Sequence, residues 1–496
     1  MVRSDRWWRR ATLLVVLVAF VHAASWAVLT PLFQGPDEIV HYGYTERVAE
    51  TGRPPTPAGS GAFSSISTTQ TLITIPWSIT GLPSWDRDDS NAQDRVMKRF
   101  DAPEANRDAP QAAGYQAGNP PLYNYVTAVP YLAAKATGAT VEGRMMAMRL
   151  TTALIGALAV LFVLLFLREL LPRRPVAVVV GALAVALQPV YGWLAGTVNN
   201  DLAVTLGGTI LLYGAARAFR RGLDLRSALI IGAGASIGML SKVSAYGLLA
   251  AAAWCTAWLL IGQRRRIRID ARRLALAVVV IVVLAYLPQW VVAQLRQPQG
   301  LLAGAENAAA TTPGSGAPSG LGKVRDVLSY VWQFYLPRLP GMDVQFRGYP
   351  DNPVWQVYLQ PFMGRFGWFQ YGFSTGQSQR LLGILAVALV AALAGLWRLR
   401  STARRHWAAL IGLVGSFVGY AVMINIRGQQ FRDETGQGFE QVRYLFPMIG
   451  FYGLLVALAL TGLPARWRRP VAVGAVALML VQVVASWGLT FDRYFL

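Results

Sequence analysis

Apolar residues form long runs along this chain, and short polar segments separate the runs. A run of roughly 20 apolar residues is long enough to cross the hydrocarbon core of a bilayer as a helix. The pattern therefore predicts an all-α, polytopic membrane protein with about eleven transmembrane helices. The predicted spans are residues 11–31, 144–167, 175–196, 201–216, 227–241, 243–262, 274–294, 381–397, 407–426, 443–463 and 470–489.

The basic residues indicate how these spans are oriented. Of the 46 Lys and Arg residues, 24 lie in six short segments that all fall on one side of the predicted map: 3–10, 168–174, 217–226, 264–273, 398–405 and 466–469. Short loops rich in Arg and Lys stay on the cytoplasmic side. The N-terminus is therefore predicted to be cytoplasmic, with an uncleaved first span. The net charge of +21 reflects this topology, and no nucleic-acid partner is expected.

Two large loops are predicted on the outer side, at about 32–143 and 295–380. The first holds twelve of the 25 acidic residues and two predicted amphipathic helices, 36–50 and 120–137. The second of these helices contains Pro130 and is expected to lie in the membrane interface rather than cross it. The loop at 295–380 begins with a flexible Gly/Ala/Ser/Pro stretch, 303–322. Any chemistry is expected on the outer side, because the inner loops are short and carry little but Arg.

Two adjacent carboxylates, Asp37 and Glu38, directly follow the first predicted span. Charges so close to hydrocarbon are costly and are usually functional. Pro36 suits the first position of a helix, which would put both acids in the first turn. Asp37, His41 and Tyr44 would then share one face. The segment favours a carboxylate that accepts a proton from an attacking hydroxyl, or else a surface helix with favourable N-terminal charges.

A departing phosphate would need cationic ligands. The candidates on the outer side are Arg149, Lys242, Arg427, Arg432 and Arg443. Lys242 occupies a brief polar break between two spans, where it binds a phosphate or snorkels to the interface. Arg443 is a phosphate ligand or an interface anchor.

Two further sets of residues each allow two interpretations. Asn200 and Asp201 form a turn for local backbone reasons, or they orient a substrate. Aromatic residues of the second outer loop belong to an interface belt or line a lipid or sugar site. They are Trp355, Trp368, Phe369 and Tyr371.

The sequence gives no support for a metal site or a nucleotide-binding site. Cys255 is the single cysteine, and the three histidines are scattered, so no metal site is expected. There is no Gly-rich nucleotide loop, and no cofactor is expected. A nucleotide-activated donor would lie on the wrong side of the membrane. An activated substrate on the outer side must therefore arrive on a lipid.

Several motifs together resemble the GT-C superfamily of integral-membrane glycosyltransferases, and in particular a bacterial branch of predicted membrane proteins. The resemblance covers almost the whole chain as a single domain, 1–496. It rests on Pro36-Asp37-Glu38-Ile39-Val40-His41, Asn119-Pro120-Pro121-Leu122-Tyr123-Asn124-Tyr125 ahead of Arg149-Leu150, Asn200-Asp201, Ser241-Lys242, Phe366-Gly367-Trp368 and Gln441-Val442-Arg443-Tyr444-Leu445-Phe446-Pro447.

The resemblance implies a polyprenyl-phosphate-linked sugar donor and inversion at the anomeric carbon. It implies that Asp37 is the catalytic base, with Glu38 as the alternative, and that Lys242 and Arg443 hold the phosphate. The other residues expected to contact substrate are His41, Tyr44, Tyr123, Arg149, Asn200, Asp201, Trp368, Gln441 and Tyr444. No separate domain follows the last predicted span, which leaves the acceptor open.

The sequence as a whole favours an inverting glycosyltransferase of the bacterial plasma membrane, which transfers a sugar to a cell-envelope glycan or lipid. Alternatives are a flippase or another transporter of lipid-linked sugars, a scaffold without chemistry, and an enzyme like an O-antigen polymerase or ligase with a diphosphate donor. Transport is less favoured, because ionisable residues cluster at the outer ends of the spans rather than midway along them.

Overall fold

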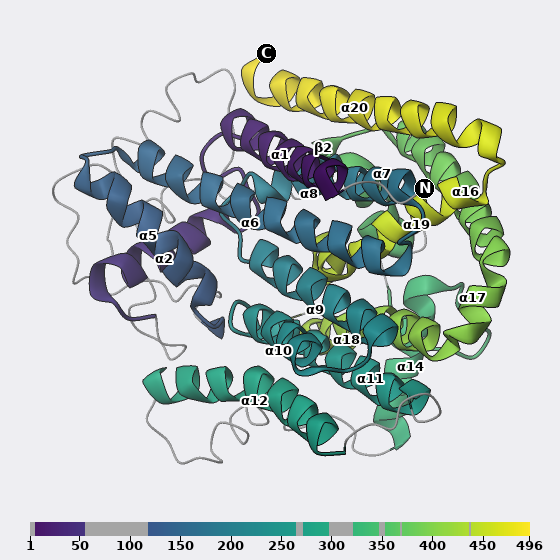
Figure 1. Cartoon of the computed structure of the whole chain (residues 1–496). Helices are drawn as coiled ribbons and strands as arrows, with labels where there is room; N and C mark the ends of the chain where they lie inside the picture. The colour runs from purple at the N-terminus through teal and green to yellow at the C-terminus, as the bar shows by residue number, and fades with distance from the viewer. Residues whose placement is uncertain are drawn as a thin grey trace.

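The computed structural model describes residues 5–54, 118–263, 271–296, 321–346, 353–367, 370–435 and 438–496. These residues form a bundle of helices with one two-stranded antiparallel ribbon (Figure 1). The N-terminal part contains α1 (Asp5–Leu29), α2 (Glu38–Thr51), α5 (Leu122–Ala136), α6 (Val141–Leu170), α7 (Pro175–Ala186), α8 (Pro189–Ala195), α9 (Asp201–Arg221), α10 (Leu225–Met239), the 3₁₀ helix η2 (Val243–Ala245), α11 (Tyr246–Gln263) and α12 (Ala271–Arg296).

The C-terminal part begins with short elements and ends with long helices. It contains α14 (Leu321–Tyr335), the π-helix η3 (Trp355–Leu359), α15 (Gln360–Gly364), β1 (Arg365–Phe366), β2 (Tyr371–Gly372), α16 (Thr375–Arg398), α17 (Arg400–Arg405), α18 (Trp407–Thr435), the 3₁₀ helix η4 (Val442–Met448), α19 (Gly450–Gly462) and α20 (Ala465–Phe495). The predicted all-α fold class is confirmed.

Seven of the described helices are long and apolar enough to cross a membrane. Two further segments are helix pairs with a sharp bend, α7 with α8 (59°) and η4 with α19 (67°), which raises the count to nine if each pair is one span. Two shorter apolar helices lie at Leu225–Met239 and Ala275–Leu284. The chain is a multi-pass membrane protein, and the predicted number of eleven spans stays a prediction.

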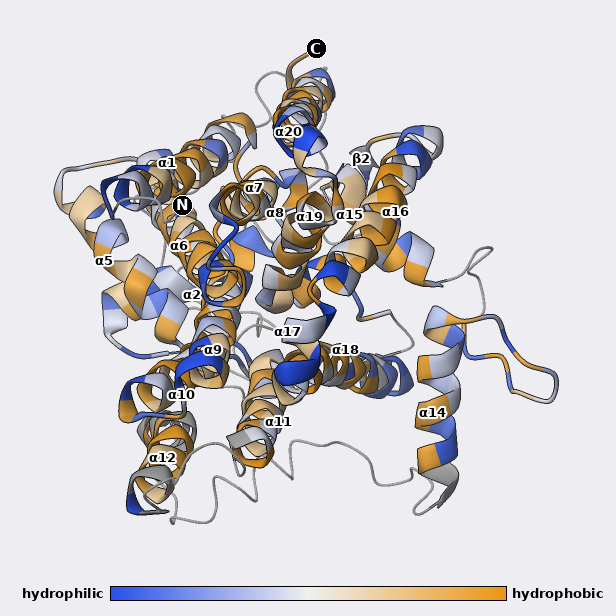
Figure 2. Ribbon diagram, turned by 45° about the vertical axis from the view of Figure 1, so that its right-hand side comes forward, coloured by the Kyte–Doolittle hydropathy of each residue, from blue (hydrophilic) through white to orange (hydrophobic). Residues whose placement is uncertain are grey.

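Close helix packing forms the centre of the bundle. Helix α9 packs against α6 and α10, while α19 packs against α7 and α16. Glycines permit two of these approaches, because a methyl group on Gly181 would overlap the backbone of Gly453, and one on Gly207 would overlap Gly234. Small residues at such crossings let helix backbones approach closely in membranes. The outer sides of α16 and α20 are apolar and exposed, as expected of surfaces in contact with lipid (Figure 2).

Helices α2 and α5 pack against each other beside α6, away from the long spans α16 and α20 (Figure 1). Helix α5 spans most of the predicted segment 120–137, and apolar side chains such as Val129 are exposed on one side of it. Helix α2 differs from the prediction at its start. It begins at Glu38, not at Pro36, because Asp37 adopts a left-handed backbone conformation (φ 58°, ψ 13°) that does not continue a helix.

Helix α14 belongs to the second predicted outer loop and packs against α18. Its buried side carries Tyr330 and Phe334, and its exposed side carries Val324 and Leu328. Helix α14 is therefore amphipathic. Most of the Gly/Ala/Ser/Pro stretch 303–322 lies outside the described residues.

Candidate active site

The connection between α1 and α2 turns the Asp37 carboxylate into the protein. Asp37 makes no side-chain hydrogen bond to the first turn of α2, although it occupies the capping position. Its Oδ2 instead accepts a hydrogen bond of 2.8 Å from Nη2 of Arg443, which lies in η4. Both side chains are buried. A left-handed aspartate is a strained choice that persists where surrounding contacts fix it.

Four buried charges form a continuous chain at this point. Asp37 is paired with Arg443, and Arg443 Nε lies 3.4 Å from Oδ2 of Asp201. Asp201 Oδ1 in turn accepts a hydrogen bond of 2.5 Å from Nζ of Lys242. We call Asp37, Asp201, Lys242 and Arg443 the charge cluster. Its two acids and two bases balance, which limits the cost of removing the charges from water.

Polar and aromatic neighbours hold the charge cluster in place. The Tyr444 ring lies 4.8 Å from Lys242 Nζ and 5.2 Å from the guanidinium carbon of Arg443, close enough for cation–π attraction. Asn200 Nδ2 donates to the Ser241 carbonyl and so ties the start of α9 to the segment of Lys242. Sequence reasoning predicted Tyr444 and Asn200 as site residues.

Asn199 was not predicted, although it joins two of the segments. Its Nδ2 donates to the Pro36 carbonyl at 2.9 Å, and its Oδ1 accepts from the Asp201 backbone N–H at 2.8 Å. Asn199 therefore positions Asp201 against the residue that precedes Asp37. Two consecutive asparagines in a turn were the available signal, but their sequence could not show which of them bridges to the other segment.

His41 lies in the first turns of α2 and is fully buried (0% exposed). Among the described residues, neither ring nitrogen has a hydrogen-bond partner. Burial lowers the pKa of His41 to about 4, despite the opposing attraction of Asp37, so the ring is neutral near pH 7. A neutral imidazole still carries one N–H donor and one acceptor nitrogen. The ring thus offers two unsatisfied polar atoms beside the charge cluster.

The lowered pKa of His41 predicts acid sensitivity. The unfolded chain takes up a proton near pH 6.5, whereas the folded chain does so only near pH 4. The free energy of unfolding should therefore fall as the pH falls through this window, by about 3 kcal/mol. Unfolding in detergent between pH 7 and 4.5 should show a shallower pH dependence for His41→Asn than for the wild type. His406→Asn is the control variant, because His406 is exposed. Equal slopes for the wild type and His41→Asn would contradict the prediction.

Glu38 and Arg149 form a separate buried pair. Arg149 Nε and Nη2 donate to the two carboxylate oxygens of Glu38 at 2.8 and 2.7 Å. Glu38 also accepts backbone N–H groups from Gly35 and Val198, and it is 0% exposed. The remaining contacts of the guanidinium are carbonyl oxygens at the end of α1 and just beyond it: Ala27, Thr30 and Pro31.

Two predicted substrate-binding tyrosines make hydrogen bonds away from the charge cluster. Tyr44 donates to the Asn119 carbonyl at 2.8 Å, and the Tyr123 hydroxyl lies 2.7 Å from Oγ1 of Thr152. The Tyr123 ring still meets the His41 ring edge-on, with centroids 6.2 Å apart. Trp368, another predicted site residue, lies outside the described residues.

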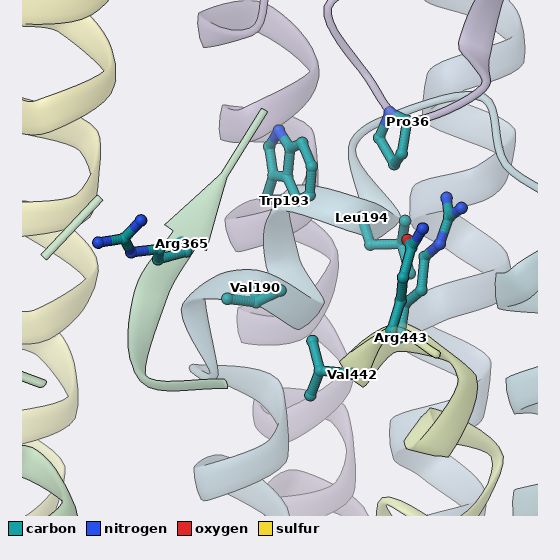
Figure 3. Close-up of a pocket in the computed structure, with 8 residues that line it drawn as sticks. Pro36, Val190, Trp193, Leu194, Arg365, Val442 and Arg443 are labelled. Carbon is teal, nitrogen blue, oxygen red and sulfur yellow. The ribbon is translucent and has the colours of Figure 1, made fainter. Parts of the chain in front are cut away.

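A small cavity adjoins the charge cluster. Its wall is mainly apolar and includes Gln441 and Arg443 together with Pro36, the residue that precedes Asp37. Figure 3 shows Pro36 and Arg443 on the same side of the cavity. Gln441 and Arg443 were predicted from the sequence, whereas Arg365 was not. The remaining lining residues are Val190, Trp193, Leu194, Arg365 and Val442. The cavity thus places apolar side chains beside Arg443, whose guanidinium group is suited to an anion. Within the described part of the chain, no group of three or more His, Cys, Asp or Glu side chains has the geometry to hold a metal ion.

Comparisons with known proteins agree with this architecture. The family model described as Predicted membrane protein (DUF2142) matches residues 20–452. No curated protein matches the sequence. The structure is similar to the archaeal oligosaccharyltransferase AglB from Archaeoglobus fulgidus, solved with an inhibitory peptide and a dolichol-phosphate. The TM-score is 0.51 at 13% identity, over 97% of this chain and 56% of AglB.

A second similar structure is ArnT from Cupriavidus metallidurans bound to undecaprenyl phosphate. Its TM-score is 0.47 at 15% identity, over 97% of this chain and 64% of ArnT. The chain thus spans less than two thirds of the length of either protein. The likeness to AglB confirms the predicted GT-C type of helical membrane fold.

Proposed function

Because the chain belongs to the DUF2142 family of predicted membrane proteins and has a GT-C fold, we propose that it is an inverting glycosyltransferase of the bacterial plasma membrane. Its donor is a sugar on a polyprenyl phosphate, and its acceptor is a hydroxyl of a cell-envelope glycan or lipid. The N-terminus is cytoplasmic and the charge cluster faces the extracytoplasmic side. One observation carries the proposal: a buried carboxylate, Asp37, is held by a buried guanidinium, Arg443, at the edge of a largely apolar cavity.

Asp37 is the general base in this proposal. The acceptor hydroxyl gives its proton to a carboxylate oxygen of Asp37 while its oxygen attacks the anomeric carbon of the donor. The bond between that carbon and the phosphate oxygen breaks, and the phosphate leaves with the electron pair. A hydroxyl is too weak an acid to ionise beforehand, so the base acts in the transition state.

The cations of the charge cluster hold the phosphate. In the structure, the charge of Arg443 is balanced by Asp37 and that of Lys242 by Asp201. An arriving phosphate competes with Asp37 for the Arg443 guanidinium, since both are oxygen anions. We infer that this exchange leaves Asp37 available to accept a proton, so that the donor lipid binds before the base acts.

Glu38 and Arg149 have a positioning role in the same proposal. Glu38 accepts four hydrogen bonds. Each carboxylate oxygen accepts one from Arg149 and one from a backbone N–H. A carboxylate in this state is poorly placed to accept a proton from a substrate. The pair instead fixes the turn between α1 and α2, which sets the direction of Asp37.

The reaction itself can be tested directly. The purified protein in detergent is incubated with a radiolabelled polyprenyl-phosphate sugar and an extract of envelope glycans and lipids. Appearance of label in an acceptor supports the transferase, and release of the polyprenyl phosphate should accompany it. A transporter would move the donor in vesicles without forming a product, which would overturn the proposal.

Removing Lys242 should weaken donor binding. Because a hydrogen bond to a charged group is lost, we expect Lys242→Ala to bind polyprenyl phosphate about ten- to a hundredfold more weakly. Lys135→Ala is the control, since Lys135 pairs with Glu50 at the surface of α2 and α5. Unchanged affinity of Lys242→Ala in a direct titration would remove this lysine from the donor site.

A further inference from the structure

Three arginines converge where α16 and α19 end and where α7 and α20 begin. Nη1 of Arg398, the last residue of α16, donates to the Leu463 carbonyl at 2.7 Å, and Nε of Arg468, in the first turn of α20, donates to the same oxygen at 3.1 Å. Arg174 directly precedes α7. The positive charges of Arg174 and Arg398 both repel that of Arg468. We call Arg174, Arg398 and Arg468 the arginine cluster.

The arginine cluster has no acidic partner. None of its members forms an ion pair with the described residues, whereas other arginines of the predicted cytoplasmic segments are paired. Glu169 pairs with Arg220 and Arg221, at 2.8 and 2.6 Å. Asp224 pairs with Arg217 at 3.1 Å. The arginine cluster thus gathers three positive charges without a balancing carboxylate, and charges of one sign at short range repel each other.

Helix capping explains only part of this arrangement. Arginine side chains often bind the last carbonyls of a helix, and Thr461 and Leu463 belong to the end of α19. Each guanidinium carries five N–H donors, however. Arg398 uses one of them, Arg468 uses two, and the side chain of Arg174 uses none within the described residues. Donors and positive charge therefore remain for an anion.

The arginine cluster is accessible from outside the bundle, and apolar side chains lie next to it. Arg398 is exposed, and Arg174 and Arg468 are partly exposed. Trp397 and Trp467, which directly precede two of the arginines, are 66% and 52% exposed. Tryptophan favours the headgroup level of a bilayer. Because the exposed apolar sides of α16 and α20 continue from there, a bound molecule would meet cations at one end and an apolar surface along its length.

We propose that the arginine cluster binds the phosphate headgroup of an anionic phospholipid, whose acyl chains lie along α16 and α20. Guanidinium groups match the geometry of phosphate oxygens. Basic sites between membrane helices bind anionic headgroups on the cytoplasmic side, and all three arginines belong to segments predicted on that side. A phospholipid suits the site better than a free anion, because only the lipid also uses the apolar surface.

This lipid site is separate from the proposed reaction centre. The charge cluster includes Arg443, near the start of η4, whereas the arginine cluster surrounds Leu463, just after α19. The two clusters therefore lie at opposite ends of the segment that η4 and α19 form. The phospholipid would be a resident of the membrane that stabilises this end of the bundle, and it would not be consumed.

The test is a titration of the full-length protein in detergent with phosphatidylglycerol, in which native mass spectrometry counts the bound lipids. Arg468→Gln should bind phosphatidylglycerol about fivefold more weakly, and the triple variant Arg174→Gln/Arg398→Gln/Arg468→Gln about a hundredfold more weakly. Zwitterionic phosphatidylcholine with the same acyl chains should bind the wild type far more weakly than phosphatidylglycerol. Equal affinity of the wild type for the two lipids would overturn the proposal.

A second triple variant, Arg9→Gln/Arg10→Gln/Arg226→Gln, is the matched control. It removes the same charge from predicted cytoplasmic segments, at exposed arginines outside the arginine cluster, and should bind phosphatidylglycerol like the wild type. An equal loss in both triple variants would overturn the proposal in favour of general surface charge, and unchanged affinity of the first triple variant would also overturn it.

Inorganic phosphate distinguishes a lipid from a free anion. Displacement of phosphatidylglycerol by an equal concentration of inorganic phosphate would overturn the proposal in favour of a free-anion site, whereas retention of the lipid supports it. Thermal unfolding without added lipid checks that each variant is folded. The single variant Arg468→Gln keeps the proposal testable if the triple variant is unstable.

Discussion

Replacing Asp37 with asparagine is expected to lower sugar transfer by about 10²–10⁴-fold, the usual contribution of a general base. The amide has nearly the same shape, and its oxygen can still accept the hydrogen bond from Arg443. What it loses is the capacity to take a proton from the acceptor hydroxyl. The rate should therefore fall while expression and affinity for polyprenyl phosphate stay near those of the wild type. Radiolabelled transfer and a lipid-phosphate titration measure the two quantities.

Glu50→Gln is the matched control for this experiment. Glu50 lies at the far end of α2, the helix that follows Asp37, and its partner Lys135 is partly exposed, so a change there should leave transfer close to normal. Full activity of Asp37→Asn would refute the assignment of the base. A loss of activity together with a loss of lipid binding would instead show that Asp37 organises the donor site.

Much of the fold could be predicted from hydropathy alone. A chain that crosses a bilayer must satisfy its backbone hydrogen bonds internally, and a helix does so within one segment. Each predicted span overlaps one or two described helices, but the pattern did not show where helices bend. The run 175–196 breaks between α7 and α8, just before Pro189, and the run 443–463 begins as a 3₁₀ helix that contains Pro447. Proline removes a backbone donor and tends to kink or end a helix, whereas a hydropathy average does not register this effect.

The site was partly predictable for a related reason. Charges at the ends of apolar runs are conspicuous, and the structure brings Asp37, Asp201, Lys242 and Arg443 together from segments far apart in the sequence. The sequence could not show which arginine pairs with which acid, because Asp37 and Glu38 are neighbours. Their side chains point in different directions, and the left-handed backbone at Asp37 accompanies this difference. Likewise, Arg365 lies in a two-residue strand that carries no sequence signal.

The buried pair Glu38–Arg149 should matter for stability rather than for the chemical step. Removing one partner leaves an uncompensated buried charge, so Glu38→Gln and Arg149→Met should each lower the free energy of unfolding by about 3–5 kcal/mol. Arg149→Met should cost more, because the carbonyls at the end of α1 also lose their donors. Denaturant or thermal unfolding in detergent measures both values.

A double-mutant cycle separates this structural role from a catalytic one. If the two side chains mainly compensate each other, Glu38→Gln with Arg149→Met should be less destabilised than the sum of the single variants, since neither charge is left buried alone. The surface pair Glu50–Lys135 gives the comparison, with an expected effect of about 0–1 kcal/mol for removing either partner. Additive losses in the cycle would mean that Glu38 and Arg149 act independently. A different result would indicate that Glu38 takes part in the reaction: Glu38→Gln would be as stable as the wild type but would lose as much transfer activity as Asp37→Asn. A residue that only fixes the turn between α1 and α2 cannot lower the reaction rate without also lowering the stability of the fold.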